Sequence, residues 1–471
     1  MSHASLHALS PVDGRYASHV DALRAHLSEA ALIVERIKVE AEWLLHLALE
    51  RPPGLQAAAQ ITPGVLERAR QLAEQPPSDA PEIVKTIERR TNHDVKAVEY
   101  YVRDQLAAAG ADAATLELVH FGCTSEDINN LAYARMLRAA RSTLLAQFDP
   151  LVEHLKKWAA TEAERGMLSR THGQTASPTT LGKEIANVTQ RLTRASNRWR
   201  DVVIFGKWNG AVGNFNAHSV AVPEADWPAI SQRFIEGMRL DYQALTTQIE
   251  PHDWVAEYCD ALAAMHTIGI DFARDVWGYI SLGYLRQRAV AGEVGSSTMP
   301  HKVNPIDFEN AEGNFGIANA LLRHFADKLP ISRWQRDLTD STVLRNVGVA
   351  IAHSLIGWRA LHRGLGKVDA NPERLSSDLA QSWEVLGEAV QTVLRAEGVA
   401  NGYELLKDLT RGQSLDANRY LEFVRGLPIP ESRKAALAAL RPESYLGLAS
   451  SLVNDTIDDH VKDHRSAVRG R

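Results

Sequence analysis

A stripe of apolar residues that recurs every three or four positions constrains the fold of this chain more than any other feature. The stripe consists of Val255, Tyr258, Leu262, Met265, Ile268, Phe272, Val276 and Tyr279. This spacing predicts one unbroken helix of roughly seven turns. Similar patterns predict helices over about 17–50, 126–165, 177–205, 306–328 and 340–364. Because an apolar face must be covered along its whole length, long helices need long partners, so we predict a mainly α fold built on a helix bundle.

Proline and glycine residues divide the chain, which has 471 residues and is too long for one compact core. Pro52-Pro53-Gly54 and Pro76-Pro77 interrupt the N-terminal region, and Asp369–Pro372 (DANP) follows the last predicted long helix. We therefore place domain boundaries near residues 112 and 365. The predicted domains are an N-terminal helical domain (1–112), a central long-helix bundle (113–365) and a C-terminal helical domain (366–471).

Charge and cysteine content argue against several classes of function. The chain has 52 Lys and Arg residues against 58 Asp and Glu residues, a net charge of −6, so we expect neither a nucleic-acid nor a membrane partner. It has two cysteines, no signal-peptide pattern and no run of about 18 apolar residues, so we expect a cytoplasmic protein. It has no CxxC or HExxH motif, no P-loop and no GxGxxG after a strand, so we expect no metal and no cofactor.

The loop Gly292–Pro305 (GEVGSSTMPHKVNP) concentrates residues that can perform chemistry. It joins two predicted long helices and places the adjacent hydroxyls of Ser296 and Ser297 near the cation of Lys302. The simplest alternative is a flexible surface loop that leads into a helix cap. A hydroxyl pair beside a cation, held between two long helices, instead favours a loop that closes over a substrate.

The segment Gly295–Asn304 resembles the signature loop of the fumarase/aspartase superfamily, whose pattern is GSSxMPxKxN, and all ten residues are compatible with it. The resemblance implies a mainly α, three-domain fold and a homotetramer whose core is a bundle of long central helices. It also implies active sites shared between subunits and an anti elimination that releases fumarate. Such a reaction needs no cofactor, because the carboxylate of the substrate takes up the negative charge.

An elimination of this kind requires a base, cationic or amide groups on the substrate carboxylate, an acid for the leaving group and the exclusion of water. By the resemblance, Ser296 is the base, and Lys302 stabilises both the serine alkoxide and the aci-carboxylate. Ser297 and Asn304 bind substrate carboxylate, and we expect Asn310 to bind substrate as well.

Two further motifs supply expected catalytic and binding groups. In SRTHGQ, the resemblance makes His172 the general acid and gives Thr171 a role in orienting the substrate, whereas a lone histidine is more often structural. In GCTSEDINN, Ser125 has the position of a helix N-cap. A cap does not exclude a second role, because hydroxyls and N–H groups at a helix N-terminus bind anions. The resemblance assigns the succinyl part of the substrate to Thr124 and Ser125.

Other segments indicate the adenylosuccinate lyase branch of the superfamily. His301 in the signature loop fits this branch, but it also fits the carboxymuconate-cycloisomerase branch. The segment SPVDGRY resembles the opening of bacterial adenylosuccinate lyases, in which Arg15 and Tyr16 would bind the phosphate and ribose end of a nucleotide. Such contacts would serve no purpose in a fumarase or an aspartase.

The segment KTIERRTNHDVKAVEY is a closer match to the same branch. The resemblance gives His93 a contact with the substrate phosphate. It places Asn92 and Asp94 beside it among the binding residues, although either of them could instead cap the helix that follows. Gln248, in TTQIEPHD, matches a family glutamine near the substrate amide or the base.

The segment SRWQRDLTDSTVLR matches phosphate and ribose contacts of this branch at Arg336, Ser341 and Arg345. Ser341 and Arg345 are four residues apart, so they share one helix face and can clamp a phosphate. The alternative is an ion pair that is solvated or buried inside the bundle.

These patterns together predict a lyase that releases fumarate from adenylosuccinate or from succinylaminoimidazole-carboxamide ribotide. A chain with a net charge of −6 must bind such small anionic substrates through clustered cations. The alternatives are another fumarate-releasing lyase such as argininosuccinate lyase, a cycloisomerase, a catalytically silent structural homologue and a helical adaptor protein. The presence of Ser296, Lys302 and His172 disfavours the silent homologue.

Overall fold

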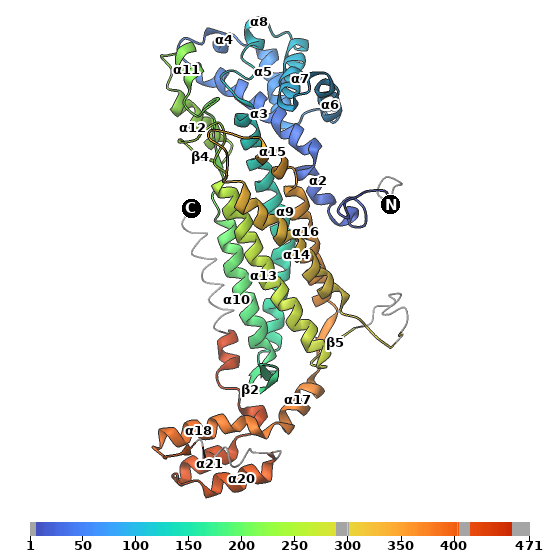
Figure 1. Ribbon diagram of the computed structural model, residues 1–471, viewed down its shortest axis with the longest axis vertical. Helices are drawn as coiled ribbons and strands as arrows, with labels where there is room; N and C mark the ends of the chain where they lie inside the picture. The colour runs from blue at the N-terminus through green and yellow to red at the C-terminus, as the bar shows by residue number, and fades with distance from the viewer. Residues whose placement is uncertain (1–5, 289–298, 300, 403, 405–414, 455–471) are drawn as a thin grey trace. The chain divides into compact units, whose positions relative to one another are not determined.

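The computed structural model describes residues 6–288, 299, 301–402, 404 and 415–454 (Figure 1). Within these residues the chain is mainly helical, as predicted, and its strands form three two-stranded sheets. The chain divides into two compact units. Unit 1 is Met1–Gln147, Ala195–Thr267 and Gly313–Arg359, and unit 2 is Phe148–Arg194, Ile268–Glu312 and Ala360–Arg471. The division into three domains stays a prediction.

Five long helices contribute residues to both units. They are α9 (Ser125–Thr161), α10 (Leu181–Arg200), α13 (Asp253–Ser281), α14 (Ile306–Lys328) and α16 (Val347–Leu365). The structure confirms the helix predicted over 306–328 with the same bounds. The apolar stripe lies in α13, and most of its residues are buried, as a helix inside a bundle requires.

Within unit 1 the long helices pack closely against one another. The Tyr258 hydroxyl of α13 donates a hydrogen bond of 3.2 Å to the carbonyl of Leu137 in α9. Phe315 of α14 packs edge to face against Trp358 of α16, with 4.5 Å between ring centroids. This approach requires a glycine at position 357, because a Cβ on Gly357 would lie 2.5 Å from the Phe315 ring.

Unit 1 also contains helices and strands that lie wholly within it. They are η1 (Ala17–His19), α2 (Asp21–Leu27), α3 (Glu29–Glu50), α4 (Gln56–Ala59), α5 (Pro63–Glu74), α6 (Ala80–Thr91), α7 (Asp94–Ala108), α8 (Ala113–Leu116), β3 (Phe205–Gly206), α11 (Asn216–Ala221), α12 (Trp227–Gly237), β4 (Asp241–Tyr242) and α15 (Thr339–Leu344). Strands β3 and β4 are parallel. Trp43 of α3, Trp208 and Phe234 of α12 form an aromatic core with ring centroids 4.7–5.0 Å apart.

Two predicted helices of unit 1 are each divided in the structure. The helix predicted over 17–50 breaks at Ser28, whose hydroxyl accepts a hydrogen bond of 3.1 Å from the Ala31 N–H and caps α3. The helix predicted over 340–364 is α15 followed by α16. Neither break contains glycine or proline, so the apolar spacing alone did not reveal it.

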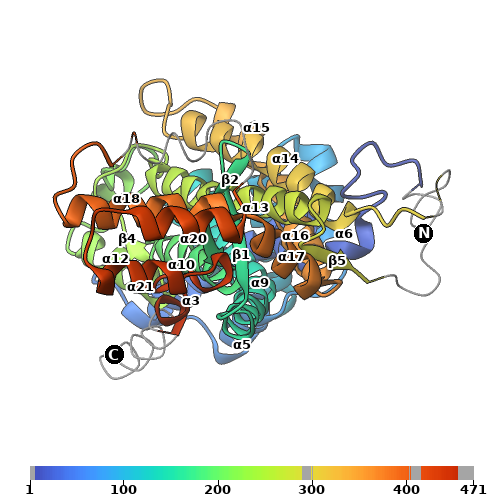
Figure 2. The same cartoon turned by 90° about the horizontal axis from the view of Figure 1, so that it is seen from below.

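Unit 2 has two antiparallel sheets and a C-terminal group of short helices. Strand β1 (Gly166–Thr171) pairs with β2 (Gln174–Thr180), and β5 (Leu285–Gln287) pairs with β6 (Val368–Ala370). The helices are α17 (Pro372–Gln381), η2 (Trp383–Leu386), α18 (Gly387–Ala396), α20 (Ala417–Gly426), α21 (Glu431–Ala439) and η3 (Pro442–Ser444). Figure 2 shows α18, α20 and α21 side by side, and Leu386, Val390, Leu394, Tyr420 and Val424 form their buried core. The helix predicted over 177–205 begins later, because β2 extends to Thr180.

Candidate active site

The structure places the predicted site residues in both units. Unit 1 holds Arg15, Tyr16, Asn92, His93, Asp94, Thr124, Ser125, Gln248, Arg336, Ser341 and Arg345. Unit 2 holds Thr171, His172, Lys302, Asn304 and Asn310. The predicted base Ser296 and its neighbour Ser297 lie outside the described residues.

Gln248 and Arg336, which are far apart in the sequence, meet at the start of α9. The Arg336 guanidinium donates to the Gln248 side-chain oxygen at 3.2 Å and to the carboxylate of Glu126, in the first turn of α9, at 2.9 Å. The Gln248 amide nitrogen donates to the carbonyl of Ala211 at 3.0 Å. Both side chains are therefore held in fixed orientations beside a hollow of about 510 Å³ that Gln248 and residues 334–338 line.

The hydroxyls of Thr124 and Ser125 lie at the N-terminus of the same helix. Helix α9 begins at Ser125, so Thr124 rather than Ser125 precedes it. The Asp127 carboxylate accepts a hydrogen bond of 2.7 Å from the Thr124 N–H, as the third helical residue does in a capping box. Among the described residues, neither hydroxyl has a hydrogen-bond partner, and both side chains are half-buried. The start of a helix of 37 residues therefore offers two free hydroxyls to an anion.

His93, rather than Asn92 or Asp94, caps helix α7. Asn92 ends α6 in the left-handed region, with φ 52°. The His93 Nδ1 then accepts a hydrogen bond of 3.1 Å from the Lys96 N–H. Because Nδ1 is the acceptor, the neutral ring carries its proton on Nε2. The side chain is 53% exposed, so Nε2 is available as a donor to an anionic ligand.

Arg345 is far from Asp94 in the sequence, but its side chain contacts Asp94 at the start of α7. Its guanidinium donates to Asp94 at 3.1 Å and to Glu29 at 2.8 Å, and Arg36 pairs with the same Oδ2 of Asp94 at 2.9 Å. Burial raises the pKa of Asp94, but Arg36, the Val95 N–H and Arg345 together lower it by more than burial raises it. The pKa therefore lies below its ordinary value. The ion-pair alternative for Arg345 is thus present, and it brings Arg345 beside the His93 cap.

The N-terminal segment approaches Arg345 as well. A hollow of about 280 Å³ is lined by residues between Val12 and Glu29 and by Arg345. Arg15 and Tyr16 lie in this segment but do not line the hollow. Ser341 is in α15, one turn before Arg345, and its N–H donates to Asp340 at 2.7 Å.

In unit 2, Thr171 and His172 lie at the tip of the β1–β2 hairpin. Thr171 pairs with Gln174, and His172 and Gly173 form the two-residue turn, with φ values of 53° and 73°. Positive φ at both positions is typical of the type I′ turn of a tight hairpin. The turn therefore lies between two strands. His172 is exposed and has no hydrogen-bond partner among the described residues, so its ring can meet a ligand.

The signature loop is described from residue 301 onward and at Met299. Lys302 is exposed, and its N–H donates to the carbonyl of Met299 at 3.0 Å. Asn304 is half-buried just before α14, and Asn310 lies in the second turn of that helix. The amide of Gln287 in β5 donates to the carbonyl of Val303 at 2.6 Å and anchors this end of the loop.

Sequence reasoning missed a set of buried charged residues behind Gln248 and Arg336. His252 is buried between Glu250 and Asp340, at 3.8 Å and 3.6 Å, and Lys207 is buried against Asp127. Their sequence gives little signal, because charged residues are rarely fully buried and are read as exposed. The position of Asp127 in the first turn of a predicted helix was the only available cue.

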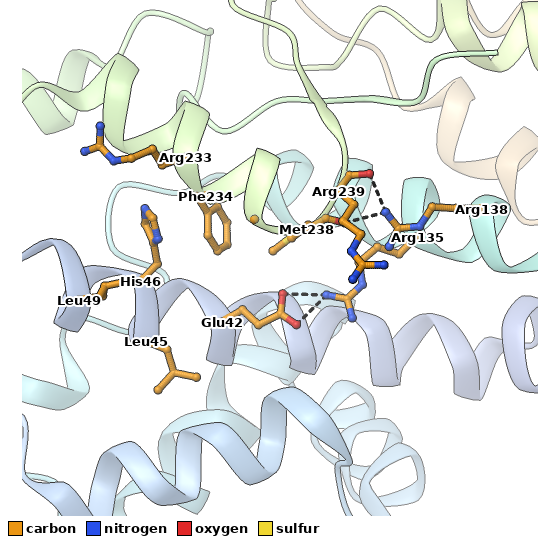
Figure 3. Close-up of a pocket in the computed structure, with 11 residues that line it drawn as sticks. Glu42, Leu45, His46, Leu49, Arg135, Arg138, Arg233, Phe234, Met238 and Arg239 are labelled. Atoms are coloured by element: carbon orange, nitrogen blue, oxygen red, sulfur yellow. Dashed lines mark hydrogen bonds and ion pairs between the residues drawn. The ribbon is translucent and has the colours of Figure 1, made fainter. Parts of the chain in front are cut away.

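A third hollow of unit 1, of about 480 Å³, is lined by none of the predicted residues (Figure 3). It contains four arginines, and three of them already have partners. Arg135 donates to both oxygens of Glu42, Arg138 donates to two main-chain carbonyls, and Arg233 pairs with Glu50. Carboxylates balance two of these arginines and main-chain carbonyls hold a third, so we do not assign the active site to this hollow. Among the described residues, no cluster of three His, Cys, Asp or Glu side chains is arranged to hold a metal ion, and no helix is long and apolar enough to cross a bilayer.

Comparison with known proteins identifies the family of this chain. A family model described as Lyase matches residues 14–319, and one described as Adenylosuccinate lyase C-terminal matches residues 332–446. The chain resembles two solved structures at a TM-score of 0.72 over 94% of its length. They are 3-carboxy-cis,cis-muconate lactonizing enzyme from Pseudomonas putida (21% identical) and a fumarate lyase from Mesorhizobium sp. BNC1 (18% identical), each covered over 97% of its chain. Fold and family matches together define a lyase of the fumarase/aspartase superfamily.

The curated relatives are more specific. The chain is 49% identical over 460 residues to adenylosuccinate lyase of Escherichia coli K12, a match that covers 97% of this chain and 100% of the relative. It is 48% identical to adenylosuccinate lyase of Vibrio cholerae, over 96% of this chain and 100% of the relative. The chain belongs to the adenylosuccinate lyase family.

Proposed function

We propose that this lyase eliminates fumarate from adenylosuccinate, which leaves AMP, and from succinylaminoimidazole-carboxamide ribotide, which leaves aminoimidazole-carboxamide ribotide. One observation carries the proposal. Arg336 holds Gln248 at the start of α9, where the hydroxyls of Thr124 and Ser125 have no partner among the described residues. This arrangement offers an amide and two hydroxyls at the positive end of a helix, which suits the two carboxylates of a succinyl group.

The succinyl group would bind at the start of α9. Its carboxylates would accept hydrogen bonds from Thr124 and Ser125 and gain from the positive end of the helix dipole. Arg336 is only 16% exposed, and Glu126 neutralises it in the free protein. Its role in the proposal is to hold the Gln248 amide toward the substrate and to contribute charge near the ribose.

The phosphate would bind at the His93 cap. The Nε2–H of His93, the Arg345 guanidinium and the Ser341 hydroxyl supply donors from two parts of the sequence. Glu29 and Asp94 balance the charges of Arg36 and Arg345 in the free protein, so the phosphate must share Arg345 with its carboxylate partners. Arg15, Tyr16 and Asn92 remain predicted contacts on the same nucleotide end.

The elimination itself would use residues of unit 2 and of the signature loop. Ser296 takes the proton from the succinyl carbon next to a carboxylate, and the negative charge passes into that carboxylate as an aci-carboxylate. Lys302, with Ser297, Asn304 and Asn310 as substrate contacts, stabilises this charge. His172 donates a proton to the leaving nitrogen, the C–N bond breaks, and fumarate is released.

The resemblance to the superfamily further supports a homotetramer whose subunits share active sites, and a location in the cytoplasm. We propose no nucleic-acid or membrane partner and no cofactor. An exposed hairpin tip that carries the general acid suits a shared site, because such a tip can reach a ligand held by another subunit.

The proposal is tested with an ultraviolet assay of the purified protein, with adenylosuccinate and without added metal or nucleotide cofactor. We expect the absorbance of the succinylated purine to fall with the wild-type protein and to stay unchanged with Ser296→Ala. The same assay with succinylaminoimidazole-carboxamide ribotide tests the second substrate. The proposal is wrong if neither substrate is consumed at any pH from about 6 to 9, where a histidine acid has its two protonation states within reach.

A further inference from the structure

A buried ion pair between Lys207 and Asp127 connects three segments of unit 1. Lys207 Nζ lies 3.2 Å from Asp127 Oδ1, and the two side chains are 0% and 1% exposed. The same ammonium donates to the main-chain carbonyls of Gly210 at 3.0 Å and Gln248 at 2.7 Å. All three protons of the ammonium therefore have an acceptor, as a buried lysine requires.

Both oxygens of the Asp127 carboxylate also have hydrogen-bond partners. One oxygen accepts from the Thr124 N–H at 2.7 Å, and the other accepts from the Asn209 N–H at 3.0 Å as well as pairing with Lys207. Asp127 thus joins the turn that precedes α9 to the segment that follows β3. The ion pair connects both of them to the main chain at Gln248.

Side-chain amides reinforce these connections. Asn130 accepts from the main-chain N–H of Lys207 at 2.8 Å and donates to its carbonyl at 3.1 Å. Asn209 donates to the hydroxyl of Thr246, two residues before Gln248, at 2.8 Å. A continuous set of hydrogen bonds therefore connects the segments around Thr124, Lys207 and Gln248.

Stability alone does not explain this arrangement. Replacing a buried ion pair by well-packed apolar side chains is often neutral or even stabilising, because two charges must be taken out of water. What the pair does provide is geometry: Asp127 holds the main chain of Thr124, and Lys207 holds the main chain of Gln248.

We propose that Lys207 and Asp127 are positioning residues that fix the Thr124 and Ser125 hydroxyls relative to the Gln248 amide, and that the lyase recognises the succinyl group through this fixed spacing. Neither residue touches the substrate. The inference rests on the proposed function, because it assigns the three positioned side chains to the succinyl group.

The test compares Lys207→Met, Asp127→Asn and the double variant. For each we would measure kcat/KM with adenylosuccinate, the dissociation constant of AMP by equilibrium dialysis, and the thermal midpoint. AMP lacks the succinyl group, so its dissociation constant should stay within about threefold of wild type, whereas kcat/KM should fall about 100-fold, the loss typical of a misplaced substrate. The double variant should regain thermal stability, because no unpaired buried charge remains, without regaining kcat/KM.

A matched control is the pair Arg135 and Glu42, which also lies in unit 1 and is drawn in Figure 3. Arg135 also pairs with Glu35 at 2.8 Å, so the control variant is Glu42→Gln, which leaves that second pair intact and should change neither kcat/KM nor AMP binding. If Lys207→Met does not fold, Thr246→Val gives the same comparison with a smaller loss of about fivefold in kcat/KM, since it removes only the hydrogen bonds of the Thr246 hydroxyl to Asn209 and to the Thr247 carbonyl.

Two results would overturn the inference. One is a double variant whose kcat/KM recovers together with its thermal midpoint, since a purely structural pair predicts that recovery. The other is an equal loss of AMP binding and of kcat/KM. Failure of the proposed function is seen separately, as a wild-type protein that does not consume adenylosuccinate.

Discussion

Replacing Arg345 by alanine tests the phosphate site. In the free protein the guanidinium pairs with Glu29 at 2.8 Å and Asp94 at 3.1 Å, and its side chain is 38% exposed. Each of these partly solvated pairs is worth about 0.2–1 kcal/mol. A charge-assisted hydrogen bond to the phosphate contributes about 1.5–3 kcal/mol. The net gain, about 1–2 kcal/mol for one such bond after the loss of a pair, corresponds to a loss of about 5- to 30-fold in kcat/KM for Arg345→Ala.

The assay compares kcat/KM for adenylosuccinate with kcat/KM for its dephosphorylated nucleoside. Arg345→Ala should lower the first by about 5- to 30-fold and leave the second within about twofold, because the nucleoside has no phosphate to lose. Arg24 is the matched control: it lines the same hollow, is 43% exposed and pairs with Asp13 and Asp21. Arg24→Ala should change neither value. Equal losses for nucleotide and nucleoside would refute the reasoning.

Three further predictions follow from the packing and the charges. Gly357→Ala should lower the free energy of unfolding by about 1–3 kcal/mol, because its Cβ would meet Phe315, and calorimetry of Gly357→Ala with and without Phe315→Leu should show partial rescue. Burial lowers the pKa of His252, but Asp340 and nearby carboxylates raise it more, so the folded pKa exceeds the unfolded value of about 6.5. The stability that His252 contributes is therefore complete below about pH 6.5 and is lost as pH rises through the folded pKa. The thermal midpoint of His252→Gln should consequently change less with pH over that range than the thermal midpoint of the wild type. Parallel curves of midpoint against pH would contradict this. Arg336→Lys should lower kcat/KM by about tenfold or more, because one ammonium cannot reproduce the planar contacts to two acceptors; steady-state kinetics unchanged from wild type would contradict this.

The long helices could be predicted because their burial follows a simple period. Helix α14 has the predicted bounds, and the stripe in α13 is buried as expected. The break at Ser28 was missed because its apolar spacing continues on both sides. The hairpin at 166–180 was missed because its second strand leads directly into α10, so the apolar spacing of the helix was extended into the strand. The local sequence does not show whether a boundary residue belongs to the element before it or to the element after it.

The candidate binding residues could be proposed from the sequence as types, but their connections could not. The motifs pointed to Gln248, Arg336 and Arg345, and the structure brings each to a partner far away in sequence. Nothing in the local sequence of Lys207 or His252 shows that either is buried, because burial of a charge depends on which distant carboxylate the fold supplies. The sequence also does not show which residue caps α7, since Asn92, His93 and Asp94 are all plausible caps by residue type.

The two-residue turn at His172 and Gly173 has a consequence for protein engineering. A turn with positive φ at both positions accepts Asn-Gly better than almost any other dipeptide. His172→Asn would therefore remove the imidazole and at the same time install the sequence that hairpins of this length prefer. The variant should lack lyase activity and should be more stable than the wild-type protein. Such a protein would trap unreacted substrate for structure determination, and it would serve as a folded negative control in cells that depend on this gene.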